Sequence, residues 1–119
     1  MKKLLGIIVL GLLLSGNAYS AIKIKNWLEG KSGSDIYIKR INDKLVFSAY
    51  SGLLTINTQL DKPFFCQPDE LKVNEQMTEA ILDAGIERFK ETGMAQIQLN
   101  DLPVGVVLLE QLKLMFPCE

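Results

Sequence analysis

The residues with the most reactive side chains are two cysteines, Cys66 and Cys118, in a chain of 119 residues that contains no histidine. Without histidine the chain lacks the commonest general base and metal ligand, which excludes a Ser-His-Asp or Cys-His site built within it. Two cysteines alone make a poor zinc site, since closed sites normally use four ligands. The spacing also differs from the Cys-x-x-Cys of redox couples. A structural disulfide is therefore favoured, with a reactive thiol pair or a metal site as alternatives.

Acidic residues supply the next candidates for chemistry. Asp69 and Glu70 are adjacent, and Asp83 and Glu87 are four residues apart on one face of a predicted helix. A glycosidase-type reaction needs two carboxylates that face each other across a cleft. Nothing in the sequence marks these residues as cleft residues, so a solvated surface is the favoured interpretation. We therefore expect a protein that is not an enzyme and has no catalytic residue, cofactor or metal site.

The first twenty residues have the pattern of a secretory signal peptide. A basic start at 1–3 is followed by an apolar run over 4–14 and by small residues over 15–21. This order predicts cleavage between Ser20 and Ala21. An uncleaved membrane anchor is the alternative, but the apolar run is shorter than the ~20 residues that a span needs. Export to the periplasm is therefore expected, and disulfides form and persist there.

Cleavage would leave one domain over 21–119, which is 99 of the 119 residues and enough for one modest core. The whole chain has 13 basic and 14 acidic residues. Removal of Lys2 and Lys3 leaves 11 against 14, a net charge of −3. A nucleic-acid-binding domain would need a basic stripe. We expect neither a nucleic-acid partner nor, after cleavage, a membrane association.

Three long segments carry the three- and four-residue apolar spacing of helices. The first covers 35–60, with Ser34 or Asp35 as its N-cap. The second covers 75–92, with an N-cap at Asn74 and a stop at Gly93, and the third begins near Pro103 and ends at Phe116-Pro117. The prediction is a mainly α, single-domain helical bundle of three to four helices with one disulfide.

Two shorter segments complete the predicted fold. Residues 22–30 are expected to form a short helix or an extended arm with Trp27 packed inward. Residues 94–100 are expected to be an extended connector rather than a strand. Phe64 or Phe65 is expected to be buried beside Cys66.

Each long segment has a predicted buried face, and for the first segment a partner-binding surface is the alternative to a core face. The predicted faces are Ile38, Ile41, Leu45, Ala49, Gly52, Leu53, Ile56 and Leu60 in the first; Met77, Ala80, Ile81, Ala84 and Phe89 in the second; and Val104, Val107, Leu108, Leu112 and Met115 in the third.

Three stretches of the sequence resemble the Tai/Rap family of type VI secretion amidase immunity proteins. They are Phe47-Ser-Ala-Tyr-Ser-Gly-Leu-Leu54, Phe65-Cys-Gln-Pro68 and Leu109-Glu-Gln-Leu-Lys-Leu-Met-Phe-Pro-Cys118. The likeness covers about residues 26–118. Many members carry a further cysteine pair in and before the first long helix, and this chain has none there.

The resemblance implies a periplasmic, non-enzymatic binding protein that inhibits a type VI secretion toxin by occluding its active site. The implied partner is a protein toxin, such as a peptidoglycan amidase, and the resemblance also implies a homodimer. No motif marks the residues that contact the toxin, so loops 61–64 and 93–101 are candidates only. A structural or accessory envelope protein with a non-toxin partner is the alternative function.

Overall fold

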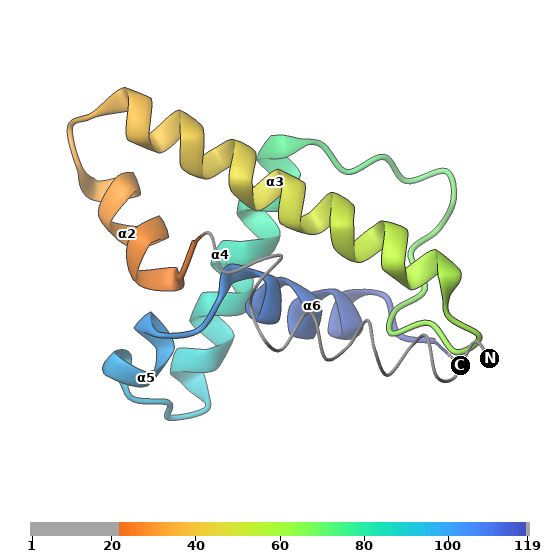
Figure 1. Cartoon of the computed structure of the whole chain (residues 1–119). Helices are drawn as coiled ribbons and strands as arrows, with labels where there is room; N and C mark the ends of the chain where they lie inside the picture. The colour runs from red at the N-terminus through yellow and green to blue at the C-terminus, as the bar shows by residue number, and fades with distance from the viewer. Residues whose placement is uncertain (1–21, 119) are drawn as a thin grey trace.

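Five helices form the secondary structure of residues 22–118, the part of the chain that the computed structural model describes (Figure 1). This confirms a small, mainly α domain with one disulfide. The predicted signal peptide lies outside the described residues. Within residues 22–118 no helix is long and apolar enough to cross a membrane. The helices are α2 (Ile24–Ser32), α3 (Ile36–Gln59), α4 (Glu75–Glu91), α5 (Gln96–Asn100) and α6 (Val104–Met115).

The ends of the long helices follow the local chemistry of the sequence. The Asp35 side chain accepts a hydrogen bond from the Tyr37 amide at 2.9 Å and so caps α3. The Asn74 side chain caps α4 in the same way, with the Met77 amide at 2.8 Å. Gly93 follows α4 with a φ of 88°, a left-handed angle that other residues rarely adopt. These predicted helix boundaries are confirmed.

Helix α6 is the centre of the core and packs against both α3 and α4 (Figure 1). Its side chains Val104, Val107, Leu108 and Leu112 are completely buried. The other buried apolar side chains are Ile22, Ile24, Trp27, Val46, Ala49, Tyr50, Leu53, Phe65, Ile81, Leu82, Ile86 and Leu99.

The predicted buried face of α3 is wrong in its first half. Ile38 and Ile41 are 49% and 53% exposed, whereas Asn42, Val46 and Asn57 are buried. Asparagine can be buried when its amide is hydrogen-bonded. Asn42 Nδ2 donates to the Asn26 carbonyl at 3.1 Å, and Asn57 bonds to the loop that follows α3. With Asn42 and Asn57 bonded inside, the side of α3 that faces the core differs from the predicted stripe through Ile38 and Ile41.

Helices α4 and α6 require smaller corrections. Ala80 and Ala84, predicted to face inward, are exposed, while Thr78 and Gly85 are buried. The Thr78 hydroxyl donates to the Asn74 carbonyl at 2.8 Å, which satisfies its polar group inside the core. Met115, predicted to be in the core stripe of α6, is 44% exposed because it lies in the last turn of the helix.

The two shorter segments are both helical. Residues 94–100 are not an extended connector, because α5 occupies 96–100 and buries Leu99. Helix α2 confirms the predicted short helix and buries Trp27. Its start is tied to the start of α6 by two backbone hydrogen bonds, from the Ile24 amide to the Leu102 carbonyl and from the Val104 amide to the Ile22 carbonyl.

A disulfide joins Cys66 to Cys118, with the two Cα atoms 5.1 Å apart and a sequence separation of 52. The Cys66 amide also donates to the Phe116 carbonyl at 2.7 Å. Phe65 is completely buried beside the bridge, as predicted. The end of α6 is therefore fixed to the loop that follows α3.

Gly85 provides a test of the close contact between α4 and α6. A Cβ at this position would lie 2.8 Å from Val107 Cγ1 and 3.2 Å from the Val107 carbonyl oxygen. Gly85→Ala should lower the free energy of unfolding by about 1–2 kcal/mol, even though alanine is the better helix former. Urea denaturation measures this change.

Val107→Ala is the matched partner for that test, because it removes the methyl group that the new Cβ meets. The double variant should lose less stability than the sum of the two single losses. A stabilising Gly85→Ala change, or strictly additive losses, would contradict the contact.

Removal of the disulfide should also be measurable. Replacing both Cys66 and Cys118 by alanine should lower the free energy of unfolding by roughly 2–4 kcal/mol, because the unfolded chain regains the freedom of a long loop. Mass spectrometry of the untreated protein should give a mass lower by two hydrogen atoms than that of the reduced protein. Equal stability of the variant, or free thiols in the untreated protein, would contradict the bridge.

Candidate functional site

A cleft of about 330 Å³ separates the second half of α3 from the loop at 67–73, and we call it the α3 cleft. Phe47 and Leu54 line it from α3, and Leu71 and Val73 line it from the loop. All four side chains are partly buried, and Phe47, Leu54 and Val73 also pack on the core. The polar residues in the lining are Ser51, Thr58, Gln67, Asp69 and Lys72, with Tyr50 and Pro68 completing it.

The loop wall of the α3 cleft is held in place by side-chain hydrogen bonds. The Tyr50 hydroxyl donates to Gln67 Oε1 at 2.7 Å, and Gln67 Nε2 donates to the Leu71 carbonyl at 3.1 Å. Asn57 Oδ1 accepts from the Phe64 amide at 2.7 Å. Burial raises the pKa of the Tyr50 phenol above its ordinary value of 10.0, which strengthens the preference for the neutral hydroxyl that donates to Gln67.

A second cleft, of about 460 Å³, lies between α2 and the start of α3. Its lining includes Asn26 and Glu29 from α2 and Ile38 and Asn42 from α3. Gly30 allows the two helices to approach here, because a Cβ on it would collide with the Asn42 amide group. The α2–α3 hydrogen bond from Asn42 to Asn26 thus sets the shape of this cleft.

Beside this second cleft, four large apolar side chains at the start of α3 are exposed to solvent, and we call them the apolar end of α3. Tyr37 is 77% exposed and Ile36 is 61% exposed, and Ile38 and Ile41 complete the group. A further isoleucine, Ile97 on α5, is 79% exposed. Single exposed apolar residues are ordinary, whereas a contiguous group marks a candidate interaction surface.

Two carboxyl groups meet where α3 packs on α4, and this pair was not predicted from the residue spacing. Asp43 and Glu79 lie within hydrogen-bonding reach of each other, and Lys39 Nζ lies 3.3 Å from Asp43 Oδ2 and 3.7 Å from Glu79 Oε1. The hydrogen bond to Asp43, with partial burial, raises the pKa of Glu79 to about 7. A proton on Glu79 gives a donor to Asp43, whose Oδ1 is buried without another partner among the described residues.

The acidic pairs considered from the sequence do not form sites. Asp83 faces α2, where its Oδ1 accepts from Trp27 Nε1 at 3.3 Å and its Oδ2 from Lys31 Nζ at 2.6 Å. Glu87 instead pairs with Lys90 on its own helix at 3.5 Å. Asp69 and Glu70 are exposed in the loop, where only Asp69 lines the α3 cleft.

The two loops that the sequence offered as candidate contacts lie at different places. Loop 61–64 follows α3 next to the disulfide, where Pro63 contributes its carbonyl 3.8 Å from Cys118 Sγ. Segment 93–101 carries α5, which packs on α2 and α4. Neither loop lines the α3 cleft or the cleft between α2 and α3.

Comparisons with protein-family models, with curated proteins and with solved structures each found no match for this chain. Among residues 22–118, no three acidic or cysteine side chains gather in a way that could hold a metal ion. The candidate functional features of residues 22–118 are therefore the exposed surfaces and clefts described above.

The Asp43–Glu79 pair predicts a pH dependence of stability. Because the pKa of Glu79 is raised from 4.5 to about 7, the folded state holds more protons than the unfolded state between these values. The contribution of Glu79 to stability should therefore be full at pH values below 4.5, and should be lost as the pH rises from 4.5 through about 7. Since the side chain is 28% exposed, we expect a loss of about 1 kcal/mol after solvent screening.

The variant Glu79→Gln keeps a neutral side chain at every pH and should flatten this part of the profile. Glu87→Gln, on the same helix but in an exposed pair, is the control and should leave the profile unchanged. Urea midpoints measured across this pH range give the comparison. A Glu79→Gln profile that still falls by the wild-type amount would show that another group is responsible.

Proposed function

We propose that this chain is an exported, non-enzymatic binding protein that acts as an immunity protein against a type VI secretion toxin of the cell-wall amidase class. The signal-like N-terminus and the Phe-Pro-Cys ending motivate the toxin class. The observation that best supports a binding role is the apolar end of α3, in which Tyr37 and three isoleucines are exposed together.

The residue types at the apolar end suit a protein interface. Tyrosine is enriched among the residues that dominate binding energy, since its ring buries a large area and its hydroxyl retains a hydrogen bond. Each Å² of apolar surface removed from water contributes about 25 cal/mol. Ile41, four residues after Tyr37 and therefore its neighbour on the helix surface, would exclude water from around that ring in a complex.

The backbone under these side chains is well fixed. Asp35 caps the first turn, and Asn42 connects the next turn to α2. Lys39 on the same helix contacts both Asp43 and Glu79. A surface held in place before binding loses less conformational entropy on association. An inhibitor that occludes an enzyme's active site would gain affinity from this rigidity.

The test is binding and inhibition of the peptidoglycan amidases made by the bacterium that encodes this chain. We expect the purified domain to form a complex with one of them and to stop its hydrolysis of peptidoglycan. Tyr37→Ser should weaken this binding by about 30-fold, the effect of losing a hot-spot residue. Titration calorimetry and a hydrolysis assay provide the two readouts.

Ile97→Ser is the matched control, because Ile97 is equally exposed but lies on α5, away from the apolar end. It should leave both readouts unchanged. Failure to bind any amidase or other toxin, together with a stable envelope partner that is no toxin, would support the accessory envelope protein instead. An effect of Ile97→Ser as large as that of Tyr37→Ser would remove the apolar end as the contact surface.

A further inference from the structure

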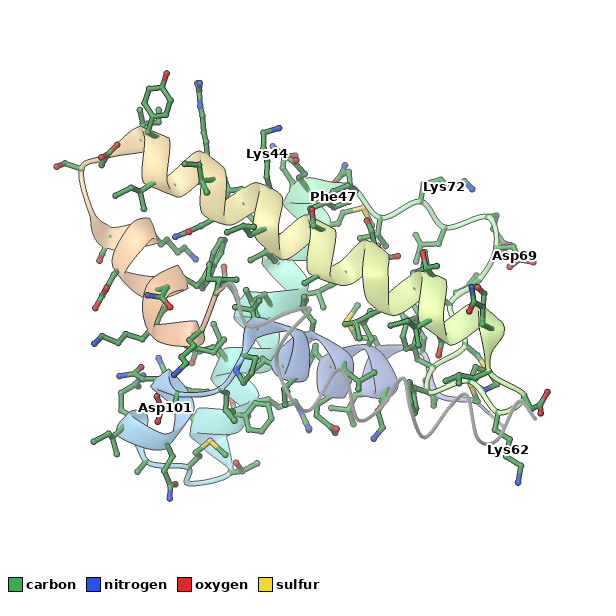
Figure 2. All side chains as sticks on the ribbon, in the orientation of Figure 1. Lys44, Phe47, Lys62, Asp69, Lys72 and Asp101 are labelled. Atoms are coloured by element: carbon green, nitrogen blue, oxygen red, sulfur yellow. A yellow bond between two sulfur atoms is a disulfide. The ribbon has the colours of Figure 1, made fainter. Side chains whose placement is uncertain are left out.

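One side of α3 carries exposed cations in its first half and the α3 cleft in its second half. Arg40, Lys44, Phe47, Ser51 and Leu54 follow one another at steps of three and four residues, so they share one side of the helix. Figure 2 shows Lys44 and Phe47 on α3 and Lys72 on the loop that forms the other wall of the cleft.

The cations on this side are not neutralised within the described part of the chain. Lys39 forms ion pairs with Asp43 and Glu79. By contrast, Arg40, Lys44 and Lys72 are exposed and form no ion pair with another described residue. One carboxylate, that of Asp69, lines the cleft, and Figure 2 shows it at the outer bend of the loop.

Lys72 lines the α3 cleft, and Arg40 and Lys44 lie on the same side of α3 in the turns before it. This local excess of positive charge contrasts with the whole chain, which has more acidic than basic residues. An apolar cleft bordered by cations is complementary to an apolar side chain that is flanked by carboxylates. The α3 cleft, at about 330 Å³, is at the lower end of the ~300–1,000 Å³ range of binding pockets. It is therefore large enough for one side chain rather than for a long hydrophobic segment.

We propose that this side of α3 binds an acidic segment of the partner protein, with one apolar side chain in the α3 cleft and carboxylates against Arg40, Lys44 and Lys72. The proposal rests on the proposed function, because it needs a protein partner. It adds the chemistry of the partner's contact segment, which the apolar end of α3 does not specify.

The same observations disfavour an anionic membrane as the ligand. Phe47, Leu54 and Val73 line a recess and are partly buried, so they do not project far enough to enter a bilayer. A partner segment can instead extend its side chain into the recess. The Tyr50–Gln67 and Gln67–Leu71 hydrogen bonds hold the recess open, since they fix the loop wall.

The probe is a short synthetic peptide with one central phenylalanine flanked on each side by two acidic residues. Two control peptides replace the phenylalanine by serine, or the acidic residues by their amides. Backbone amide NMR spectra of the domain should change at 47–58 and 67–73 with the acidic phenylalanine peptide and much less with either control. Higher salt should weaken this binding, because the cations are exposed.

Charge reversal supplies the matched variants. Lys72→Glu should weaken binding of the acidic phenylalanine peptide about tenfold, whereas Lys62→Glu, a cation outside the cleft lining, should change it less than twofold. Unfolding curves of both variants show whether either has lost its fold. If Lys72→Glu is unstable, Lys44→Glu on the exposed side of α3 takes its place.

Several results would overturn the proposal. Equal binding of the neutral control peptide would remove the role of the cations, and NMR changes confined to 36–41 would place the contact at the apolar end. Binding to vesicles of anionic lipid but not to the peptide would assign the surface to a membrane. An amidase complex that forms equally well with Lys72→Glu would contradict this inference and leave the proposed function intact. Binding of the peptide without any toxin complex would contradict the proposed function and leave the acidic-segment site intact.

Discussion

Burial of α6 between α3 and α4 is the interaction on which the rest of this structure depends. Val104, Val107, Leu108 and Leu112 are completely buried and supply the centre of the only large apolar cluster among residues 22–118. The start of α6 is bonded to the segment before α2, and its end is bonded and disulfide-linked to the loop after α3. Both ends of the central helix thus connect elements that are distant in sequence.

Among residues 22–118, the other helices pack on one side of α3, and loop 67–73 contacts its second half. Its inner side meets α4 and α6, and its first half is also fixed to α2 through Asn42. Another side carries the exposed cations and the α3 lining of the cleft, where Figure 2 shows Lys44 and Phe47. The apolar end occupies the first turns of the same helix. The long helix is therefore both a core element and a rigid support for the surfaces proposed to bind a partner. The disulfide contributes to the second role, because Cys66 lies at the start of the loop that forms the cleft wall.

Local sequence signals were sufficient for the helix ends. Asp35, Asn74 and Gly93 act within one turn of their own position, so a cap or a stop can be predicted from neighbouring residues. The cysteine pair was also predictable, since a chain with two cysteines allows only one disulfide within it. The helix in segment 94–100 was not predictable, because the five-residue α5 is too short to show a helical apolar pattern. Its one buried side chain, Leu99, packs in the core.

Surfaces were harder to predict than helices. The apolar stripe through Ile38 and Ile41 suggested a core face, and only the burial of Asn42 and Asn57 shows that the helix is rotated away from it. Spacing cannot reveal that an asparagine has a tertiary hydrogen-bond partner. Spacing also could not predict the Asp43–Glu79 pair, because its two residues lie on different helices. The α3 cleft depends in addition on a loop without regular structure, so no periodic pattern could have indicated it.

If this domain binds a toxin through the exposed side of α3, the toxin should protect that side from solvent. Hydrogen–deuterium exchange of the domain, alone and saturated with a peptidoglycan amidase toxin, measures this protection. We expect slower exchange in the complex over 36–58 and 67–73, with α5 unchanged. Slower exchange confined to 93–101, or no change anywhere on addition of such toxins, would contradict it.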